Sequence, residues 1–224
     1  MGIDIAGLNH LIYCKQYGNF NRTITLGKQE IHVATDLIKN ALYTNKNYGG
    51  YCESLLVECF GSTHVDSADN SDYEGASVIF DLSKIISDDD IVEKYDTIID
   101  YGTLEHVYNI PNALYNVSKL CKVGGQIIHI LPANNFCGHG FWQISPELFF
   151  SLYSEKNGYE QTEIFIMDTI NTNDIKKLNA PVDGNRILID GQNPIYVAVR
   201  TVLSKENFSH LHVQQSDYVY LWSK

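Results

Sequence analysis

The sequence is poor in arginine, in paired cysteines and in long apolar runs, and each absence excludes a class of protein. Arginine occurs only at Arg22, Arg186 and Arg200, and 16 Lys plus Arg stand against 27 Asp plus Glu, for a formal net charge of −11. An acidic chain with no basic run is unsuited to DNA, RNA or another polyanion, because phosphate binding needs clustered Lys and Arg. The five cysteines form no CxxC pair, which disfavours a disulfide framework or a structural zinc site.

The apolar runs are also too short for a membrane helix. The run around His129 spans residues 127–131, whereas a membrane helix needs roughly 20 apolar residues. The first residues, MGIDIAGLNH, show no basic segment followed by an apolar one, and Ala6 stands where a myristoylation motif has Ser or Thr. We therefore expect a cytoplasmic protein without a signal peptide or membrane span. The oligomeric state stays open, and a homodimer is compatible with the sequence.

The chain does contain the apolar mass of one globular domain, since 44% of its 224 residues are hydrophobic. Short β-like runs alternate with helix-like stretches. This alternation predicts an α/β fold, with a mostly parallel sheet covered by helices on both faces. Strands are expected near residues 23–26, 63–65, 77–80, 97–99, 126–131, 163–167 and 195–203, and helices near 31–42, 51–60, 88–94, 109–121 and 145–157. Asn109 and Ser145 are the expected N-caps of the last two helices, and Gly124-Gly125 is expected to end the helix near 109–121.

Conspicuous residues follow five of the expected strands: Gly27, Asp66, Asp81, Asp100 and Pro132. Ligands of such sheets bind outside the carboxyl ends of the strands, so this edge is the expected active edge. Each aspartate could also simply cap a local turn. The first of these turns reads LGKQE, and neither GxGxxG nor GxxxxGK[ST] occurs. A nucleotide-dependent oxidoreductase or an ATP-binding protein is therefore disfavoured.

The stretch YDTIIDYGTLEHV at 95–107, followed by Gly124-Gly125 and a strand ending at Pro132, resembles the middle of a class I S-adenosylmethionine-dependent methyltransferase. The resemblance extends over roughly residues 22–203 and implies a Rossmann-like fold with a mostly parallel seven-stranded sheet. Residues 1–21 are then expected to be an N-terminal extension packing on the core, and 204–224 a C-terminal extension. SDYEGA, PANN and GHGFWQISPE resemble a bacterial subgroup associated with surface-glycan or small-metabolite gene clusters.

The resemblance implies S-adenosylmethionine as the cofactor and S-adenosylhomocysteine as its product. It assigns Asp66 to the ribose, Asp81 to the adenine and Asp100 to the amino-acid end of the cofactor, with Tyr101 and Gly102 near the methyl group. The implied cofactor-binding residues are Gly27, Lys28, Gln29, Asp66, Asp81, Leu82, Asp100, Tyr101 and Gly102.

The expected catalytic residues are Glu105, His106 and His139. Methyl transfer to a hydroxyl group needs a group that accepts a proton, and both histidines are expected on loops above the strand ends. Each histidine could instead serve only the structure of its loop. Two imidazoles and a carboxylate could also hold a divalent cation with open positions, as in some methyltransferases with similar residues. Gly102 stands where such sites often have a second carboxylate.

The expected acceptor is a small polar molecule, such as a sugar or polysaccharide precursor methylated on oxygen. Asn134, Asn135, Trp142 and Tyr73 are its candidate contacts, although packing under a lid explains Trp142 equally well. N-methylation of a small metabolite is one alternative. A non-catalytic methyltransferase-like binding protein is another, because the glycine-rich first motif is reduced to LGKQE.

Overall fold

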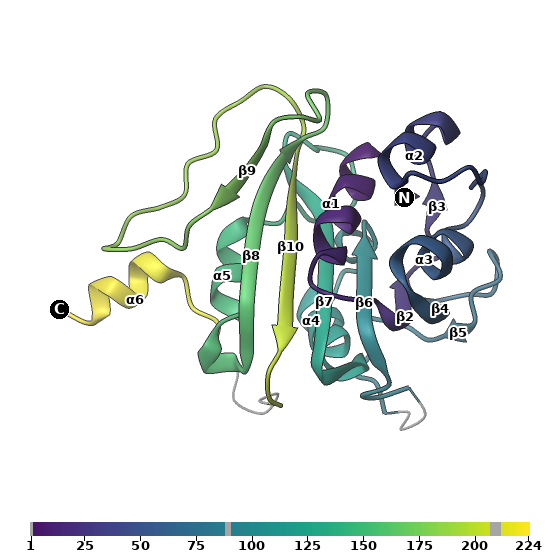
Figure 1. Ribbon diagram of the computed structural model, residues 1–224. Coiled ribbons are helices and arrows are strands. Elements are labelled where there is room, and N and C mark those ends of the chain that lie inside the picture. Colours follow the sequence, from purple (N-terminus) through teal and green to yellow (C-terminus); the bar gives the residue numbers. More distant parts are fainter. Residues whose placement is uncertain (1, 88–90, 207–211) are drawn as a thin grey trace.

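The computed structural model describes residues 2–87, 91–206 and 212–224 (Figure 1). An eight-stranded sheet in the order β5-β4-β2-β6-β7-β10-β8-β9 forms its centre, and β1 and β3 form a second, two-stranded sheet. The strands are β1 (Gly2–Ile3), β2 (Asn21–Leu26), β3 (Glu30–Ile31), β4 (Ser62–Asp69), β5 (Val78–Ile79), β6 (Tyr95–Tyr101), β7 (Cys121–Asn134), β8 (Tyr159–Asp168), β9 (Ile175–Leu178) and β10 (Ile195–Leu203). The helices are α1 (Ile5–Lys15), α2 (Thr35–Leu42), α3 (Glu53–Phe60), α4 (Ile110–Leu120), α5 (Pro146–Leu152) and α6 (Ser216–Trp222), with the 3₁₀ turns η1 (Leu104–His106) and η2 (Glu155–Asn157).

The strand order confirms the predicted α/β, Rossmann-like, mostly parallel fold. Strands β5, β4, β2, β6 and β7 run parallel, in the 3-2-1-4-5 order of a doubly wound nucleotide-binding sheet. Strand β10 is inserted antiparallel between β7 and β8. The sheet has eight strands rather than seven, because β9 adds an antiparallel strand to its edge. The order reverses between β2 and β6, so the ligand crevice of such a fold is expected there.

Each face of the sheet has its own apolar cluster, because neighbouring strand residues point to opposite faces. Ile98 and Ile127 belong to the cluster that contains α4 and α5, whereas Ile99 and Ile128 belong to the one that contains α1, α2 and α3. Figure 1 shows these two groups of helices on opposite faces. The sheet is therefore buried on both faces over β6 and β7, so a ligand would reach these two strands at their ends.

The caps of two helices are as the sequence predicts. The Asn109 side chain accepts a hydrogen bond from the Asn112 amide at 3.4 Å, and Pro111 lies in the first turn of α4. Ser145 caps α5 in the same way through the amide of Glu147 at 3.3 Å. These short polar side chains satisfy amides that have no partner inside the helix.

Other element boundaries differ from the prediction. Gly124-Gly125 was expected to end a helix, but α4 ends at Leu120 and β7 begins at Cys121 with no loop between them. Both glycines therefore lie within β7. The pairing with β6 is irregular there, because Cys121 pairs with Tyr95 and, after a shift of register, Gln126 pairs with Thr97. Gly124 has a left-handed φ of +85° in this irregular part.

The helix expected over 31–42 is shorter, and α2 covers Thr35–Leu42 only. Ile31 belongs to β3 instead, which pairs with β1 at the N-terminus. The helix expected over 88–94 falls partly outside the described residues, and residues 91–93 form a turn before β6. The helical spacing of the apolar residues predicted the wrong element at Ile31, because pairing of β3 with the remote strand β1 decides the structure there.

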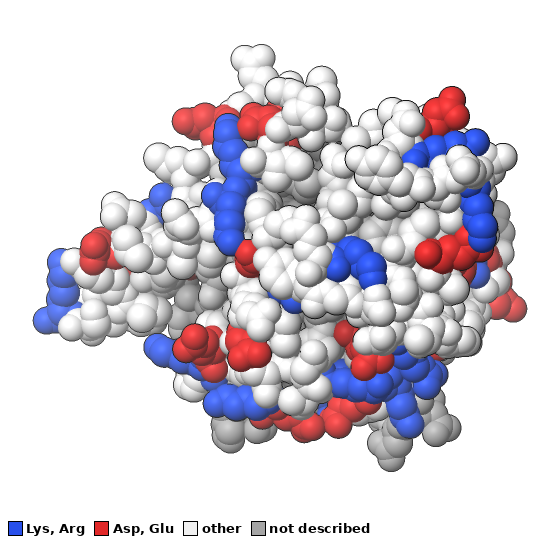
Figure 2. Space-filling view, viewed as in Figure 1, with Lys and Arg blue, Asp and Glu red and all other residues white. Residues whose placement is uncertain are grey.

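Helix α1 covers the face of the sheet that carries Tyr101. Asp4 caps it by accepting from the Gly7 amide at 2.8 Å, and Leu8 and Leu11 are buried in the same cluster as Phe165 of β8. Figure 1 shows α6 apart from the sheet, beside the segment between β9 and β10. No helix within the described ranges is both long and apolar enough to cross a membrane. On the face drawn in Figure 2, acidic and basic side chains lie beside one another, with uncharged surface between them.

Candidate active site at the carboxyl edge of the sheet

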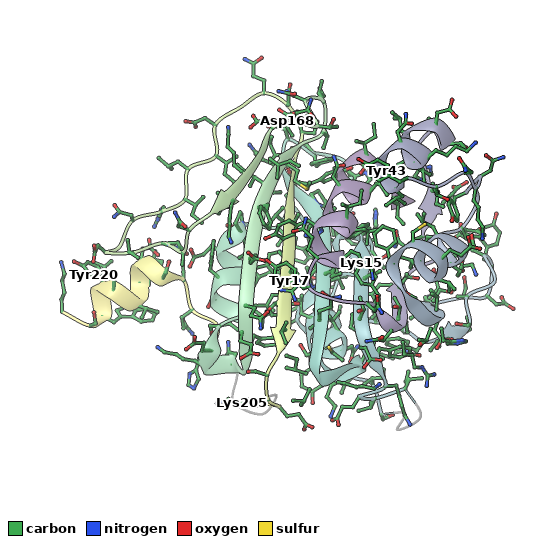
Figure 3. The ribbon with its side chains drawn as sticks, in the orientation of Figure 1. Lys15, Tyr17, Tyr43, Asp168, Lys205 and Tyr220 are labelled. Carbon is green, nitrogen blue, oxygen red and sulfur yellow. The ribbon has the colours of Figure 1, made fainter. Side chains whose placement is uncertain are left out.

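The parallel strands end at one edge, at the top of Figure 3, where Asp168 marks the end of β8. Gly27 follows β2 there with φ +69°. The Thr103 hydroxyl donates to the Leu26 carbonyl at 2.7 Å, and a Cβ on Gly27 would lie only 2.9 Å from that hydroxyl. The lone glycine of LGKQE is therefore required by both its backbone conformation and its close neighbour.

The expected ribose carboxylate, Asp66, does not follow a strand. Strand β4 continues to Asp69, so Asp66 lies inside it, paired with Ile24 of β2. Its carboxylate accepts from the Ser77 hydroxyl at 2.9 Å and the Tyr95 hydroxyl at 3.1 Å. The sequence analysis ended this strand too early, because its sequence STHVDSAD is polar and lacks the apolar alternation of a typical strand.

Asp69 takes the strand-end position that the sequence analysis gave to Asp66. Its Oδ2 lies 4.0 Å from the position of a Cβ on Gly27, so this carboxylate faces the β2 turn. Asp69 is only partly buried. Asp69 is thus the carboxylate beside the β2 turn, where the fold predicts the ligand crevice. The pairing of Leu26 with Ala68, one residue before Asp69, reveals this position, and the sequence carries no local signal of it.

Asp81 and Leu82 lie after β5, as expected from the sequence, but both have local roles. The amide of Ser83 donates to Asp81 at 2.9 Å and its hydroxyl at 2.6 Å. These hydrogen bonds lower the pKa of the Asp81 carboxyl. Leu82 is buried in the apolar core. Asp81 therefore caps a turn, and an adenine contact there stays a prediction.

Lys28 and Gln29 follow Gly27 in different environments. The Lys28 ammonium pairs with Glu53 at 2.6 Å. Gln29 is 2% exposed and its Nε2 donates to the Leu26 carbonyl at 2.6 Å. Its Oε1 is buried and has no donor among the described residues. A buried acceptor without a donor costs free energy. Gln29 Nε2 lies 3.7 Å from the position of a Cβ on Gly27, so this incompletely paired amide group adjoins the β2 turn.

Asp100 is completely buried, contrary to its expected contact with the amino-acid end of a cofactor. Its Oδ1 accepts from the Thr103 amide at 3.0 Å, and its Oδ2 lies 2.8 Å from His129 Nδ1. His129 Nε2 lies 2.6 Å from the Tyr153 hydroxyl. Burial raises the pKa of Tyr153 well above its ordinary value, so the phenol stays protonated and donates to His129, whose Nδ1 then donates to Asp100. This relay fixes the start of η1.

Tyr101 also points away from the edge. It is 2% exposed, and its hydroxyl lies 3.2 Å from His10 Nδ1 under α1. Gly102 follows it with φ +90° and lines a small cavity with Tyr101, Asp4 and Tyr196. The N-terminal segment therefore covers β6, β7 and β10 at the edge. Tyr101 and Gly102 were both expected near the methyl group of the cofactor. Gly102 lines this cavity, whereas the hydroxyl of Tyr101 is buried beside His10.

Glu105, His106 and His139 come together, although the sequence separates His139 from the other two by more than thirty residues. Among the described residues they form a group whose ligand atoms all lie within 4.8 Å of one another. Glu105 Oε1 is 3.8 Å from His106 Nε2 and 3.5 Å from His139 Nε2. The side chain of Glu105 is fully buried, whereas those of His106 and His139 are 50% and 40% exposed.

The loop that carries His139 is held to η1 through the backbone of Glu105. The amides of Phe141 and Trp142 donate to the Glu105 carbonyl at 2.7 and 3.2 Å. Gly140, at φ +73°, packs so closely that a Cβ would lie 2.8 Å from Glu105 Cγ. Trp142 Nε1 donates to the Val107 carbonyl at 3.0 Å. The GHGFW segment is therefore shaped to place His139 over Glu105.

The electrostatics of this cluster are unusual. Burial, reinforced by the nearby Asp100, raises the pKa of Glu105 to about 8. Burial and the neighbouring His139 lower the pKa of His106. Perturbed titratable groups that converge at the ligand edge of a fold are typical of functional sites.

The four candidate substrate contacts are spread around the edge. Asn134 ends β7 and is partly exposed. The Asn135 amide donates to the carbonyls of Gly191 and Asn193 at 3.0 and 2.9 Å, so it fixes a loop. Tyr73 is 91% exposed on the loop after β4. Trp142 adjoins the Glu105 cluster, because its backbone amide donates to the Glu105 carbonyl, and contact of any of the four with an acceptor stays a prediction.

Comparison with known proteins adds similar backbone arrangements. No family model and no curated protein matches the chain. A methyltransferase from Thermotoga maritima, described as a possible histamine N-methyltransferase, is 13% identical, with 88% of each chain covered and a TM-score of 0.48. The YcgJ protein of a Bacillus species is 10% identical, with 89% and 100% covered and a TM-score of 0.48. A phosphoethanolamine N-methyltransferase of Haemonchus contortus, solved with S-adenosylhomocysteine, is 10% identical, with 88% and 53% covered and a TM-score of 0.49.

Proposed function

We propose that this protein is an S-adenosylmethionine-dependent methyltransferase acting on a small polar acceptor. The observation that carries the proposal is one edge of a doubly wound sheet that holds two adjoining features. Gly27 and Asp69 face each other beside the point where the strand order reverses. The Glu105, His106 and His139 cluster follows β6 at the same edge. Cofactor and acceptor would thus meet above β2 and β6.

The residues at the β2 turn fit this cofactor. A carboxylate at the end of the second strand of a doubly wound sheet accepts hydrogen bonds from ribose hydroxyls, which is the role we propose for Asp69. The buried Gln29 Oε1, which has no donor among the described residues, suits the ammonium group of the cofactor's amino-acid end. Gly27 lets the backbone approach the ligand. Bound there, the cofactor supplies an electrophilic methyl group.

The Glu105 cluster supplies the chemistry that the acceptor needs. A hydroxyl acceptor must lose a proton as the methyl group is transferred, and a positioned imidazole or carboxylate accepts it. In the metal-free protein the exposed His139 is the proposed base, and the Glu105 carboxylate lies 3.5 Å from its Nε2. Asn134 and Trp142 would hold the acceptor and exclude water. We propose a sugar methylated on oxygen, with N-methylation of a small metabolite as the alternative.

Calorimetry with S-adenosylmethionine and S-adenosylhomocysteine tests the cofactor. We expect Asp69→Asn to weaken binding of both about tenfold or more, because it removes a charge-assisted hydrogen bond of about 1.5–3 kcal/mol. Asp36→Asn, on the exposed first turn of α2, is the matched control and should leave binding unchanged. If neither compound binds the wild-type protein, the proposal is wrong.

Turnover tests catalysis apart from binding. His139→Ala should lower methyl transfer to a responsive sugar about 10²–10⁴-fold, the range for loss of a general base, while cofactor affinity persists. The second candidate is a binding protein that does not turn over, and the reduced first motif LGKQE favours it. That candidate predicts cofactor binding with no transfer to any acceptor tested.

A further inference from the structure

We infer that Glu105, His106 and His139 form a binding site for one divalent transition-metal ion. Metal binding by these residues needs no methyltransferase activity. The role of the metal, which is to hold an oxygen atom of the acceptor and favour its deprotonated form, rests on the proposed function. The ion would thus define the acceptor class as molecules with a metal-binding hydroxyl group.

The distances fit a metal centre better than they fit hydrogen bonds. Glu105 Oε1 is 3.5 Å from His139 Nε2 and 3.8 Å from His106 Nε2, and all three ligand atoms lie within 4.8 Å of one another. A side-chain hydrogen bond would bring such atoms to about 2.7–3.2 Å. Ligands on a tetrahedral ion with bonds of about 2.0–2.1 Å are separated by about 3.3 Å, so small side-chain rotations would suffice.

The Glu105 carboxylate lacks the partners that a buried carboxylate needs. The residue is 0% exposed, and neither Oε1 nor Oε2 has a hydrogen-bond donor among the described residues. An isolated buried charge is strongly unfavourable, and proteins compensate it by pairing, by a metal or by protonation. A protonated Glu105 would still leave both buried oxygens without a hydrogen-bond partner among the described residues. The carboxylate is aimed at two imidazoles, the commonest metal ligands in proteins. A cation between the three groups would supply the missing partner.

The cluster is held by hydrogen bonds on the side of the protein core and is open to solvent on the opposite side. Asp100 fixes η1 from inside, and the Glu105 carbonyl holds the Phe141 and Trp142 amides of the His139 loop. The two imidazoles are 50% and 40% exposed, so the side of the site away from the core is accessible. Three protein ligands with open positions are the arrangement of catalytic rather than structural metal sites.

The ligand types select the metal class. Imidazole favours Zn²⁺, Co²⁺, Fe²⁺ and Ni²⁺, whereas Mg²⁺ and Ca²⁺ prefer sites made of oxygen ligands. Two histidines and one carboxylate are also the ligand set of open non-haem iron sites. We therefore expect Zn²⁺ and Co²⁺ to bind, and Mg²⁺ to compete weakly.

Titration of the EDTA-treated full chain with Zn²⁺, and with Co²⁺ followed by visible absorption, tests the inference. We expect one equivalent of each to bind. Loss of an outer-shell partner alone costs about 10–100-fold in metal affinity, so Glu105→Gln and His139→Ala should each weaken binding at least about 100-fold. His32→Ala is the matched control, because His32 lies 4.0 Å from Glu30 in an exposed pair that belongs to no group of three possible metal ligands among the described residues.

Two further measurements separate loss of metal binding from loss of folding, and the metal site from the cofactor site. Thermal unfolding checks that each variant folds, and the half-exposed His106→Ala provides a second ligand variant should Glu105→Gln fail to fold. Absence of stoichiometric binding, or unchanged affinity in all three ligand variants, would overturn the inference. Calorimetry with S-adenosylmethionine on the metal-free protein separates the proposals. Cofactor binding without metal binding removes only the metal site, and metal binding without cofactor binding removes only the methyltransferase.

Discussion

Asp100 and Glu105 are both completely buried at the same edge of the sheet, yet their surroundings are opposite. Asp100 accepts from the Thr103 amide and contacts His129, whereas neither oxygen of Glu105 has a donor among the described residues. The first carboxylate is complete within the protein and serves the structure. The second has no such donor among the described residues, so burial depth alone does not separate a structural carboxylate from the one that we propose as a ligand-binding group.

The largest expected loss of stability comes from removing the charge of Asp100, the carboxylate whose hydrogen bonds are satisfied within the protein. Asp100→Asn should lower the free energy of unfolding by about 2–4 kcal/mol, because it removes a charged acceptor from buried donors that then lack a full partner. Urea denaturation measures this change. A loss below about 1 kcal/mol would mean that the relay through His129 and Tyr153 contributes little to stability.

His10 is a third fully buried polar group, and its Nε2 also lacks a hydrogen-bond partner among the described residues. Unlike a carboxylate, a histidine can avoid a buried charge by staying neutral in the folded protein. Burial, with smaller effects of His129 and Arg200, lowers its pKa from 6.5 to about 3, while Glu163 opposes the shift. The unfolded chain therefore binds a proton below pH 6.5 that the folded protein does not. Stability is full above pH 6.5 and falls by about 1.4 kcal/mol for each pH unit below it, down to about pH 3.

Several carboxylates with lowered pKa values also lose stability in acid, so the measurement is a difference. Urea denaturation of wild type and His10→Gln at pH 7 and pH 5 isolates the contribution of His10. We expect wild type to lose about 2 kcal/mol more than the variant between these pH values. Parallel pH profiles of the two proteins would show that His10 does not stay neutral when folded.

Gly140 tests the contact that places His139 over Glu105. Gly140→Ala should destabilise the protein more than Gly138→Ala, although both glycines have positive φ, at +73° and +88°. A Cβ on Gly140 would lie 2.8 Å from Glu105 atoms, whereas one on Gly138 would meet nothing within 4 Å. The left-handed backbone costs each variant about 1–2 kcal/mol, and the clash adds about 1 kcal/mol to Gly140→Ala. Equal losses in thermal unfolding would contradict this packing.

The smallest expected change in stability is that of Glu105→Gln, and it tests the contrast between Glu105 and Asp100 most directly. In metal-free protein, Glu105→Gln should alter the free energy of unfolding by less than about 1 kcal/mol, in either direction, because the carboxylate has no donor to lose. Urea denaturation beside Asp100→Asn measures the contrast. If Glu105→Gln costs as much as Asp100→Asn, then Glu105 is a structural carboxylate as well.

Much of the fold was predictable because its signals are local. Strand β10 spans Ile195–Leu203, as its β-branched run predicts, and Asn109 and Ser145 cap the helices that they were expected to cap. The end of β4 was not predictable in this way. Its polar sequence carries no alternating pattern, so only pairing with β2 shows that Asp69, rather than Asp66, ends the strand.

The site was predictable in part. The LEHV and GHGF segments indicated Glu105, His106 and His139, and the fold brings these three together. Their roles as base and metal ligands stay predictions. The direction of β10, and the N-terminal segment that covers the strand ends, depend on contacts between remote segments and left no local signal.

The sequence by itself determined the alternation of strands and helices, the helix caps and the types of side chain at the ligand edge. Tertiary structure alone decided which carboxylates are satisfied. Asp100 acquires its partner from His129 of β7, while the same folding buries Glu105 beside two exposed imidazoles with no donor among the described residues. The physical reason is that burial and hydrogen bonding depend on groups that distant parts of the chain bring into contact.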